Sequence, residues 1–241
     1  RLIQLRHLIK GGRIMETAIK LENVNKSFGK GIGKVQVLKD VNFAANLGEL
    51  CLVLGPSGSG KSTFLTIAGG LQTPDSGKVI IDGQDFLSLP SKKRDQFRLN
   101  KIGFVLQSYN LLPYLNIADQ FKLVQQVKED GNMDQKEFHQ LLDELGIEKL
   151  LKQYPAELSG GQNQRVAIAR ALYTEPQIVL AEPTSALDSD RVEMVGKLLK
   201  ELAAERNKAV IVVTHDLRLR QFADKIYQLE DGKLKREKVP Q

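Results

Sequence analysis

The sequence predicts an α/β domain with a largely parallel central sheet, and three features carry this prediction. Apolar runs of strand length occur at 50–54, 177–181 and 209–213, and such runs are typical of parallel strands covered on both faces. Helix-compatible segments separate these runs, as in repeated strand–helix units. Each run ends at a glycine-rich or polar motif, which is where such sheets bind ligands. At 241 residues, one domain with an inserted subdomain explains the chain better than two independent domains.

The first apolar run leads directly into a loop that fits the pattern G-x-x-x-x-G-K-[ST]. Its residues are Gly55, Pro56, Ser57, Gly58, Ser59, Gly60, Lys61, Ser62 and Thr63. Glycines let such a loop turn so tightly that its N–H groups and the positive end of the following helix converge on an anion. We expect it to bind a nucleoside triphosphate, with Lys61 at the β- and γ-phosphates, the Ser62 hydroxyl on Mg²⁺ and Thr63 beside the α-phosphate. A chance glycine- and serine-rich turn is the alternative, but the strand before the loop and the apolar helix after it favour the nucleotide site.

A second anion site is predicted where the segment Leu158-Ser159-Gly160-Gly161-Gln162 precedes a helical stretch, 166–172. This segment places the hydroxyl of Ser159 and the bare backbone N–H groups of Gly160 and Gly161 at a helix N-terminus. We expect the site to hold a γ-phosphate that belongs to another copy of the chain.

Two side chains follow the other apolar runs. Glu182 comes after 177–181, and a carboxylate at the end of a parallel strand can polarise an attacking water. An isolated histidine is usually structural, but His215 ends a central strand at the edge that also carries Gly55 and Glu182. Residues from about 115 to 153 are mostly helical and are predicted to form the inserted subdomain.

The net charge of +6 lies at the two ends of the chain. Residues 1–15 carry +4 and residues 233–241 carry +3, which leaves −1 for the middle. A near-neutral body with basic ends is a weak footprint for nucleic acid, so no nucleic-acid partner is expected. The basic ends fit solvated tails near anionic lipid headgroups.

The ends of the chain and its cysteine content complete the outline. We expect residues 1–16 to form a basic N-terminal extension, in which Met15 is the more natural first residue, and residues 236–241 to form a C-terminal tail. The single cysteine, Cys51, lies in an apolar strand and excludes an intramolecular disulfide. No apolar run reaches the roughly 18 to 20 residues that cross a bilayer.

Taken together, these motifs resemble the ATP-binding cassette family, the nucleotide-hydrolysing subunits of ABC transporters, over about residues 17–235. The segment 158–162 is identical to the family signature LSGGQ and stands in the right order after the phosphate loop and before Glu182 and His215. The resemblance implies a P-loop NTPase fold in which an ABC ATPase core carries an antiparallel β subdomain and an α-helical subdomain within about 84–165.

The resemblance also implies roles for single residues. Phe28 corresponds to the aromatic residue that stacks on adenine, Gln107 to the glutamine that contacts Mg²⁺ and the attacking water, and Asp188 to the D-loop aspartate. Glu182 matches the catalytic glutamate, and His215 matches the histidine that contacts the γ-phosphate. Family members form head-to-tail dimers with two ATP molecules, each held between one phosphate loop and the opposite signature, here Ser159, Gly160, Gly161 and Gln162.

Within the family, the segment 107–115 and the motif 214–218 are similar to the ATPases of the lipoprotein-release and macrolide-exporter group. Segments 113–115, 188–191 and 229–233 look most like the ATPase of bacterial heme-efflux exporters. The partner implied is an integral membrane permease with an FtsX-like fold, and the implied location is the cytoplasmic face of the membrane. Leu111, Leu112 and Tyr114 would anchor the permease, although each could equally be a packing residue of the subdomain.

One position departs from the family pattern. An aspartate that binds Mg²⁺ through water normally precedes the glutamate, but here that position is Ala181. The spacing from Pro176 to Glu182 is also one residue short, as though the aspartate were absent rather than replaced. If Ser62 and Gln107 hold Mg²⁺ alone, we expect weakened Mg²⁺ dependence and slow turnover.

Two other functions remain open at this point. A soluble family member could act as a nucleotide switch on nucleic acid or the ribosome, but such members usually carry long coiled-coil insertions or two cassettes. The other alternative is a regulator that binds ATP and scarcely hydrolyses it, and the departure from the family pattern at Ala181 is compatible with this function.

Overall fold

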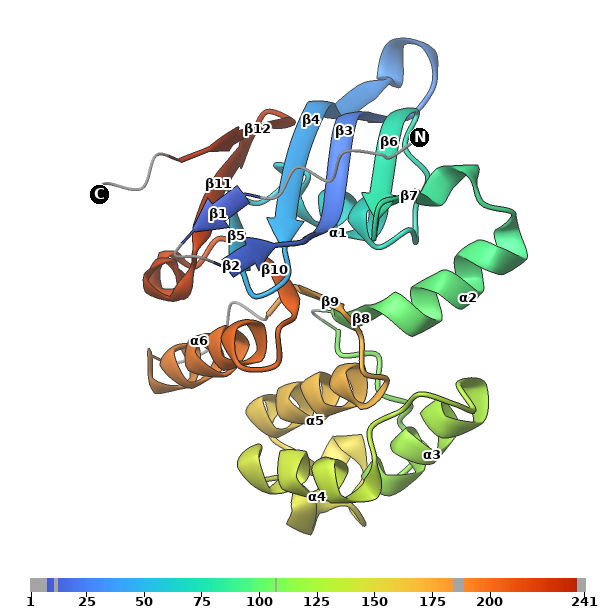
Figure 1. Ribbon diagram of the computed structural model, residues 1–241, viewed down its shortest axis with the longest axis vertical. Coiled ribbons are helices and arrows are strands. Elements are labelled where there is room, and N and C mark those ends of the chain that lie inside the picture. Colours follow the sequence, from blue (N-terminus) through green and yellow to red (C-terminus); the bar gives the residue numbers. More distant parts are fainter. Residues whose placement is uncertain (1–7, 11–12, 107, 184–188, 238–241) are drawn as a thin grey trace.

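The computed structural model describes residues 8–10, 13–106, 108–183 and 189–237, and its elements follow the expected α/β order (Figure 1). The central sheet has six strands in the order β12-β11-β5-β10-β9-β8. Its strands are β5 (Leu50–Leu54), β8 (Ile102–Val105), β9 (Ile178–Ala181), β10 (Ala209–Thr214), β11 (Lys225–Glu230) and β12 (Lys233–Arg236). All neighbours pair in parallel except β11 and β12, which form an antiparallel hairpin.

Successive residues of the central strands pack into two different cores, which explains why the runs are apolar throughout. In β5, Leu50, Leu52 and Leu54 belong to a core shared with the helices α5 (Gly160–Tyr173) and α6 (Ser189–Ala204). Cys51 and Val53 belong to a second core on the other face, shared with helix α1 (Lys61–Ala68). The strand has no solvent face, so every position selects an apolar residue.

A second sheet has four antiparallel strands in the order β4-β3-β6-β7, and this is the antiparallel β subdomain expected from the family resemblance. Its strands are β3 (Thr17–Phe28), β4 (Val35–Asn46), β6 (Ser76–Ile81) and β7 (Gln84–Asp85). Ile19, Phe43 and Val79 from this sheet pack in the same core as Phe64 of α1. Helix α1 is therefore enclosed between the two sheets.

Helices α3, α4 and α5 form a separate helical layer below the sheets in Figure 1, whereas α1 lies between the two sheets. The helices are α1 (Lys61–Ala68), α2 (Ser91–Lys101), α3 (Ile117–Val127), α4 (Gln135–Glu144), α5 (Gly160–Tyr173) and α6 (Ser189–Ala204). Phe121, Phe138 and Tyr173 join α3, α4 and α5 through edge-to-face contacts, with ring centroids 4.8 Å apart for Phe121 and Phe138. Helix α4 ends as expected, because Gly146 adopts a left-handed φ of 62°.

Shorter elements complete the fold. The strands β1 (Leu8–Lys10) and β2 (Arg13–Met15) pair antiparallel within the basic N-terminal stretch. The 3₁₀ helices are η1 (Gly31–Gly33), η2 (Phe86–Ser88), η3 (Glu148–Leu150), η4 (Pro155–Glu157) and η5 (Leu217–Phe222). Within the described ranges, none of the helices has the length and apolar character needed to span a bilayer.

Candidate nucleotide site

Strand register brings three of the predicted residues to one edge of the central sheet. Strand β10 lies between β5 and β9, and Thr214 pairs with Leu54 while Val212 pairs with Ala181. The residues that leave these strands at their carboxyl ends are Gly55, Glu182 and His215. The phosphate loop, the carboxylate and the imidazole therefore start from adjacent strands.

The phosphate loop depends on glycine at two places. Gly60 has a φ of 101° and is the N-cap of α1, so it has no side chain to cap the helix. A Cβ at Gly55 would lie 2.3 Å from the Leu229 carbonyl oxygen and 2.6 Å from the Ser59 Oγ, so only glycine fits there. The first N–H groups of α1 have no partners within the helix and are available to an anion.

Two polar side chains of the loop add to this cradle. Lys61 is buried, and its ammonium donates hydrogen bonds to the carbonyl oxygens of Gly55 at 2.8 Å and Pro56 at 2.7 Å. Burial lowers the pKa of Lys61, and the charge of Glu182 opposes that change. The Ser59 hydroxyl is also buried and has no hydrogen-bond partner among the described residues. A buried unpaired hydroxyl beside uncapped N–H groups fits a phosphate group.

Ser62 and Glu182 form the part of the site that fits a metal ion. The Ser62 Oγ donates a hydrogen bond of 2.8 Å to the Glu182 Oε1. The Glu182 backbone is held in turn, because its N–H donates to the Val105 carbonyl oxygen at 2.8 Å. A hydroxyl and a carboxylate are oxygen ligands of the kind Mg²⁺ prefers.

Phe28 ends strand β3, where it pairs with Val35 of β4, and 42% of its surface is exposed. The Lys26 Nζ lies 5.5 Å from the centroid of the Phe28 ring. The structure therefore leaves the ring accessible to a flat ligand such as adenine.

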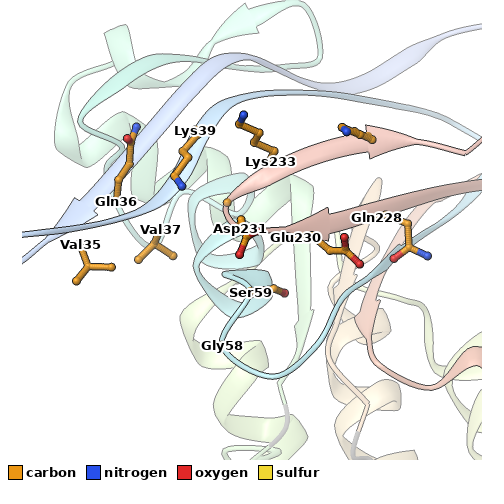
Figure 2. Close-up of a pocket in the computed structure, with 12 residues that line it drawn as sticks. Val35, Gln36, Val37, Lys39, Gly58, Ser59, Gln228, Glu230, Asp231 and Lys233 are labelled. Carbon is orange, nitrogen blue, oxygen red and sulfur yellow. The ribbon is translucent and has the colours of Figure 1, made fainter.

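A cavity of about 620 Å³ beside the phosphate loop was not foreseen from the sequence. Figure 2 shows Gln36 and Lys39 of β4, Lys233 of β12 and Ser59 of the loop around it. Its walls come from segments about 180 residues apart in the chain, so no local pattern could have revealed it.

The signature segment lies in the helical layer, away from α1 (Figure 1). Ser159 is the N-cap of α5, where its Oγ accepts from the Gln162 N–H at 3.3 Å and its own N–H donates to the Gln162 Oε1 at 2.8 Å. Both Ser159 and Gly160 are exposed, and a Cβ at Gly160 would meet no described atom within 4 Å. Within one chain, the signature and the phosphate loop are two separate half-sites.

The segment 108–115 borders an apolar cavity of about 830 Å³ between α2, α3 and α5. Leu112, Phe104 and Leu123 line this cavity, and Tyr114 is 71% exposed nearby in the sequence. The Arg170 guanidinium fixes the segment by donating to the backbone oxygens of Tyr109 and Asn110 at 2.6 and 2.7 Å. Burial lowers the pKa of Arg170.

The structure brings together the phosphate loop, Glu182 and His215, and it holds the signature apart from them. Gln107 and Asp188 lie outside the described residues, so their predicted roles depend on the family resemblance alone.

A phosphate loop between two sheets, a carboxylate on the neighbouring strand and a signature helix in a separate layer define a nucleotide-binding cassette. The chain belongs to the ABC transporter family, whose sequence profile matches residues 38–185. It is an ABC ATPase, and ATP and Mg²⁺ are its ligands.

Two relatives and two solved structures illustrate this membership. The protein named hemin import ATP-binding protein HrtA in Staphylococcus haemolyticus is 44% identical to this chain, and the match covers 90% of this chain and 99% of the relative. The protein of the same name in Staphylococcus epidermidis is also 44% identical, and the match covers 89% of this chain and 97% of the relative. The cassette MJ0796, solved as a dimer in a post-hydrolysis state with ADP and Pi, is 41% identical over 92% of this chain and 99% of its own, with a TM-score of 0.83. The cassette cbiO1 of Clostridium perfringens, described as part of the transporter complex cbiONQ, is 28% identical over 91% and 87%, with a TM-score of 0.77.

Proposed function

We propose that this chain forms a head-to-tail dimer around two ATP molecules and drives an integral membrane permease that exports heme. The observation that carries the dimer is the separation of the two half-sites within one chain (Figure 1). Neither half-site alone encloses a triphosphate, whereas two facing ones do. The solved dimer of the similar cassette MJ0796 supports the same arrangement.

In each composite site, the residues of one chain bind the nucleotide and those of its partner close it. Phe28 stacks on adenine. The phosphate oxygens accept hydrogen bonds from the backbone N–H groups of residues 57–63 and from the Lys61 ammonium. Lys61 then bonds to phosphate oxygens in place of the carbonyl oxygens of Gly55 and Pro56. Ser62 and Gln107 hold Mg²⁺, which neutralises phosphate charge when bound. His215 contacts the γ-phosphate, while Asp188 and the signature, 159–162, act across the dimer interface.

The permease binds next to the helical layer. Leu112 lines the apolar cavity of about 830 Å³, and the exposed Tyr114 lies two residues further along the chain. A short permease helix would cover these side chains, so the cassette sits peripherally at the cytoplasmic face of the membrane. An FtsX-like fold for the permease follows from the resemblance to the lipoprotein-release and macrolide-exporter group. In this proposal, residues 17–235 are the ATPase domain, about 84–165 contain the helical subdomain, and 1–16 and 236–241 flank it.

The substrate and the direction of transport rest on sequence similarity. The staphylococcal relatives carry the word hemin in their names, which supports heme as the cargo, and those names say import. The resemblance of 113–115, 188–191 and 229–233 to heme-efflux ATPases supports export.

A transport assay tests both points. The permease that co-purifies with the chain is reconstituted into vesicles with the cassette and ATP on the outside. Export predicts ATP-dependent accumulation of hemin in the vesicle lumen. ATP-dependent loss of hemin from preloaded vesicles would show import, and no movement in either case would exclude heme as the substrate.

A further inference from the structure

We propose that Glu182 is the metal-side carboxylate of the ATP site and not the base for the attacking water, so that ATP closes the dimer but is hydrolysed slowly. This inference rests on the proposed function, because it refines how the same ATP site works. It departs from the role that the family resemblance assigns to Glu182.

The first support is the hydrogen bond that Glu182 already makes. Its Oε1 accepts the Ser62 hydroxyl at 2.8 Å, and Ser62 is the residue expected to bind Mg²⁺. A carboxylate bonded to a metal ligand orients that ligand and stabilises the metal. This hydrogen bond turns the carboxylate toward Ser62 and so toward the metal side of the site.

The second support is the register of strand β9. Val179 and Ala181 point into the core shared with α5 and α6, whereas Ile178 and Leu180 point into the core shared with α1. The ladder with β8 continues past the strand, because the Glu182 N–H donates to the Val105 oxygen. Alternation therefore turns Glu182 toward α1, and Ser62 lies in the first turn of that helix.

The absent aspartate determines which carboxylate after β9 faces α1. If an aspartate stood between Ala181 and Glu182, it would take the α1-facing position beside Ser62, and the glutamate would move on by one residue to the opposite side. The family pattern has both carboxylates in this order. In this chain, Glu182 is the one carboxylate of this pair, and the alternation of side chains along β9 turns it toward Ser62.

The other carboxylates at this edge, among the described residues, are placed differently. At the end of β11, Glu230 and Asp231 line the cavity of about 620 Å³, and β5 and β10 separate β11 from β9. Asp216, which follows the neighbouring strand, is held by the Arg218 guanidinium at 2.6 Å, and this pairing lowers the pKa of Asp216. His215 also follows β10, and it is proposed to contact the γ-phosphate. The site therefore supports binding of Mg-ATP better than activation of water.

Three variants test the assignment. Glu182→Gln removes the charge beside Ser62, and Glu193→Gln makes the same change on the exposed face of α6 as a matched control. In the third variant, an aspartate is inserted between Ala181 and Glu182. The readouts are the Mg²⁺ concentration that half-saturates binding of a fluorescent ATP analogue, the fraction of dimer with ATP, and kcat.

We expect Glu182→Gln to raise the half-saturating Mg²⁺ concentration about 10- to 100-fold and to reduce ATP-dependent dimer formation, while Glu193→Gln changes neither. The insertion should keep Mg²⁺ binding and raise kcat about 100-fold or more, because it supplies a general base. If Glu182→Gln binds Mg-ATP like the unmodified chain and accumulates as a closed dimer, Glu182 is the base and the inference is wrong. If the unmodified chain itself fails to dimerise with ATP, the proposed function fails instead.

Discussion

The Ser62 Oγ lies 2.8 Å from the Glu182 Oε1, and this hydrogen bond joins residues that are 120 positions apart in the sequence. It connects the first turn of α1 to the residue that follows β9. Helix α1 packs between the two sheets, and Glu182 directly follows a central strand and is tied to β8 by its backbone N–H. The metal side of the site is therefore set by the core of the domain.

Replacing Lys61 should weaken ATP binding more than it disturbs the fold. Its ammonium makes hydrogen bonds only to carbonyl oxygens of its own loop among the described residues, so Lys61→Ala removes no long-range hydrogen bond. A hydrogen bond to a charged group contributes about 1.5–3 kcal/mol, which corresponds to a Kd roughly 10- to 100-fold higher. Titration with a fluorescent ATP analogue measures this, and the exposed Lys20→Ala is the control. An unchanged Kd would remove Lys61 from the phosphate site.

Phe28 should contribute to ATP affinity through its ring face. Phe28→Ala is expected to raise the Kd for ATP about tenfold, because stacking on a base contributes roughly 1–3 kcal/mol, whereas Phe28→Tyr should bind as tightly as the unmodified chain. The control is Ile32→Ala, which removes a fully exposed apolar side chain nearby. Equal losses in Phe28→Ala and Phe28→Tyr would contradict stacking.

The sequence was sufficient for features set by local pattern. The positive φ of Gly60 and the cap at Ser159 follow from motifs a few residues long, and the alternation of Leu52 and Val53 between two cores follows from an uninterrupted apolar run. The antiparallel turn at 231–232 was equally local, and both residues have positive φ as an Asp-Gly hairpin requires.

Features that depend on packing between distant segments could not be predicted. The sequence placed Glu182 at the edge of the sheet but not against Ser62, since that contact depends on which face of β9 covers α1. The cavity between Lys39 and Lys233 was missed for the same reason. The hydroxyl of Ser159 was expected to point outward for a phosphate, and the structure shows that its oxygen also accepts the Gln162 N–H of its own helix.

Gly160 should be essential to the dimer and unimportant to the monomer. A Cβ at Gly160 would meet no described atom within 4 Å, so Gly160→Ala and the bulkier Gly160→Leu should leave the thermal midpoint of the nucleotide-free chain unchanged or slightly higher. In the proposed dimer the γ-phosphate of the partner's ATP lies against this position. Light scattering with saturating ATP should therefore show less dimer for Gly160→Ala and none for Gly160→Leu. Normal dimerisation of Gly160→Leu would show that the signature does not face the partner's nucleotide.

Cys51 should make the fold sensitive to alkaline pH. Burial in β5 raises the pKa of its thiol from the ordinary 9.0 to about 12. The thiol has a higher pKa in the folded chain than in the unfolded chain. The contribution of Cys51 to the free energy of unfolding is therefore complete below pH 9.0 and is lost as the pH rises from there toward about 12. The buried Tyr227, with a pKa raised to about 12, acts in the same direction but remains in a Cys51→Ala variant.

The free energy of unfolding of the unmodified chain should therefore fall relative to Cys51→Ala by about 1.4 kcal/mol between about pH 8 and about pH 10. Urea unfolding of both chains at both pH values measures this difference, and the comparison removes the titration of groups that do not interact with Cys51. Alkylation of Cys51 by iodoacetamide should also be slow in the native chain and fast in urea, since the thiolate forms readily only after unfolding. A constant difference between the two chains, or rapid alkylation of the native one, would mean that the thiol is not held in the core of the sheet.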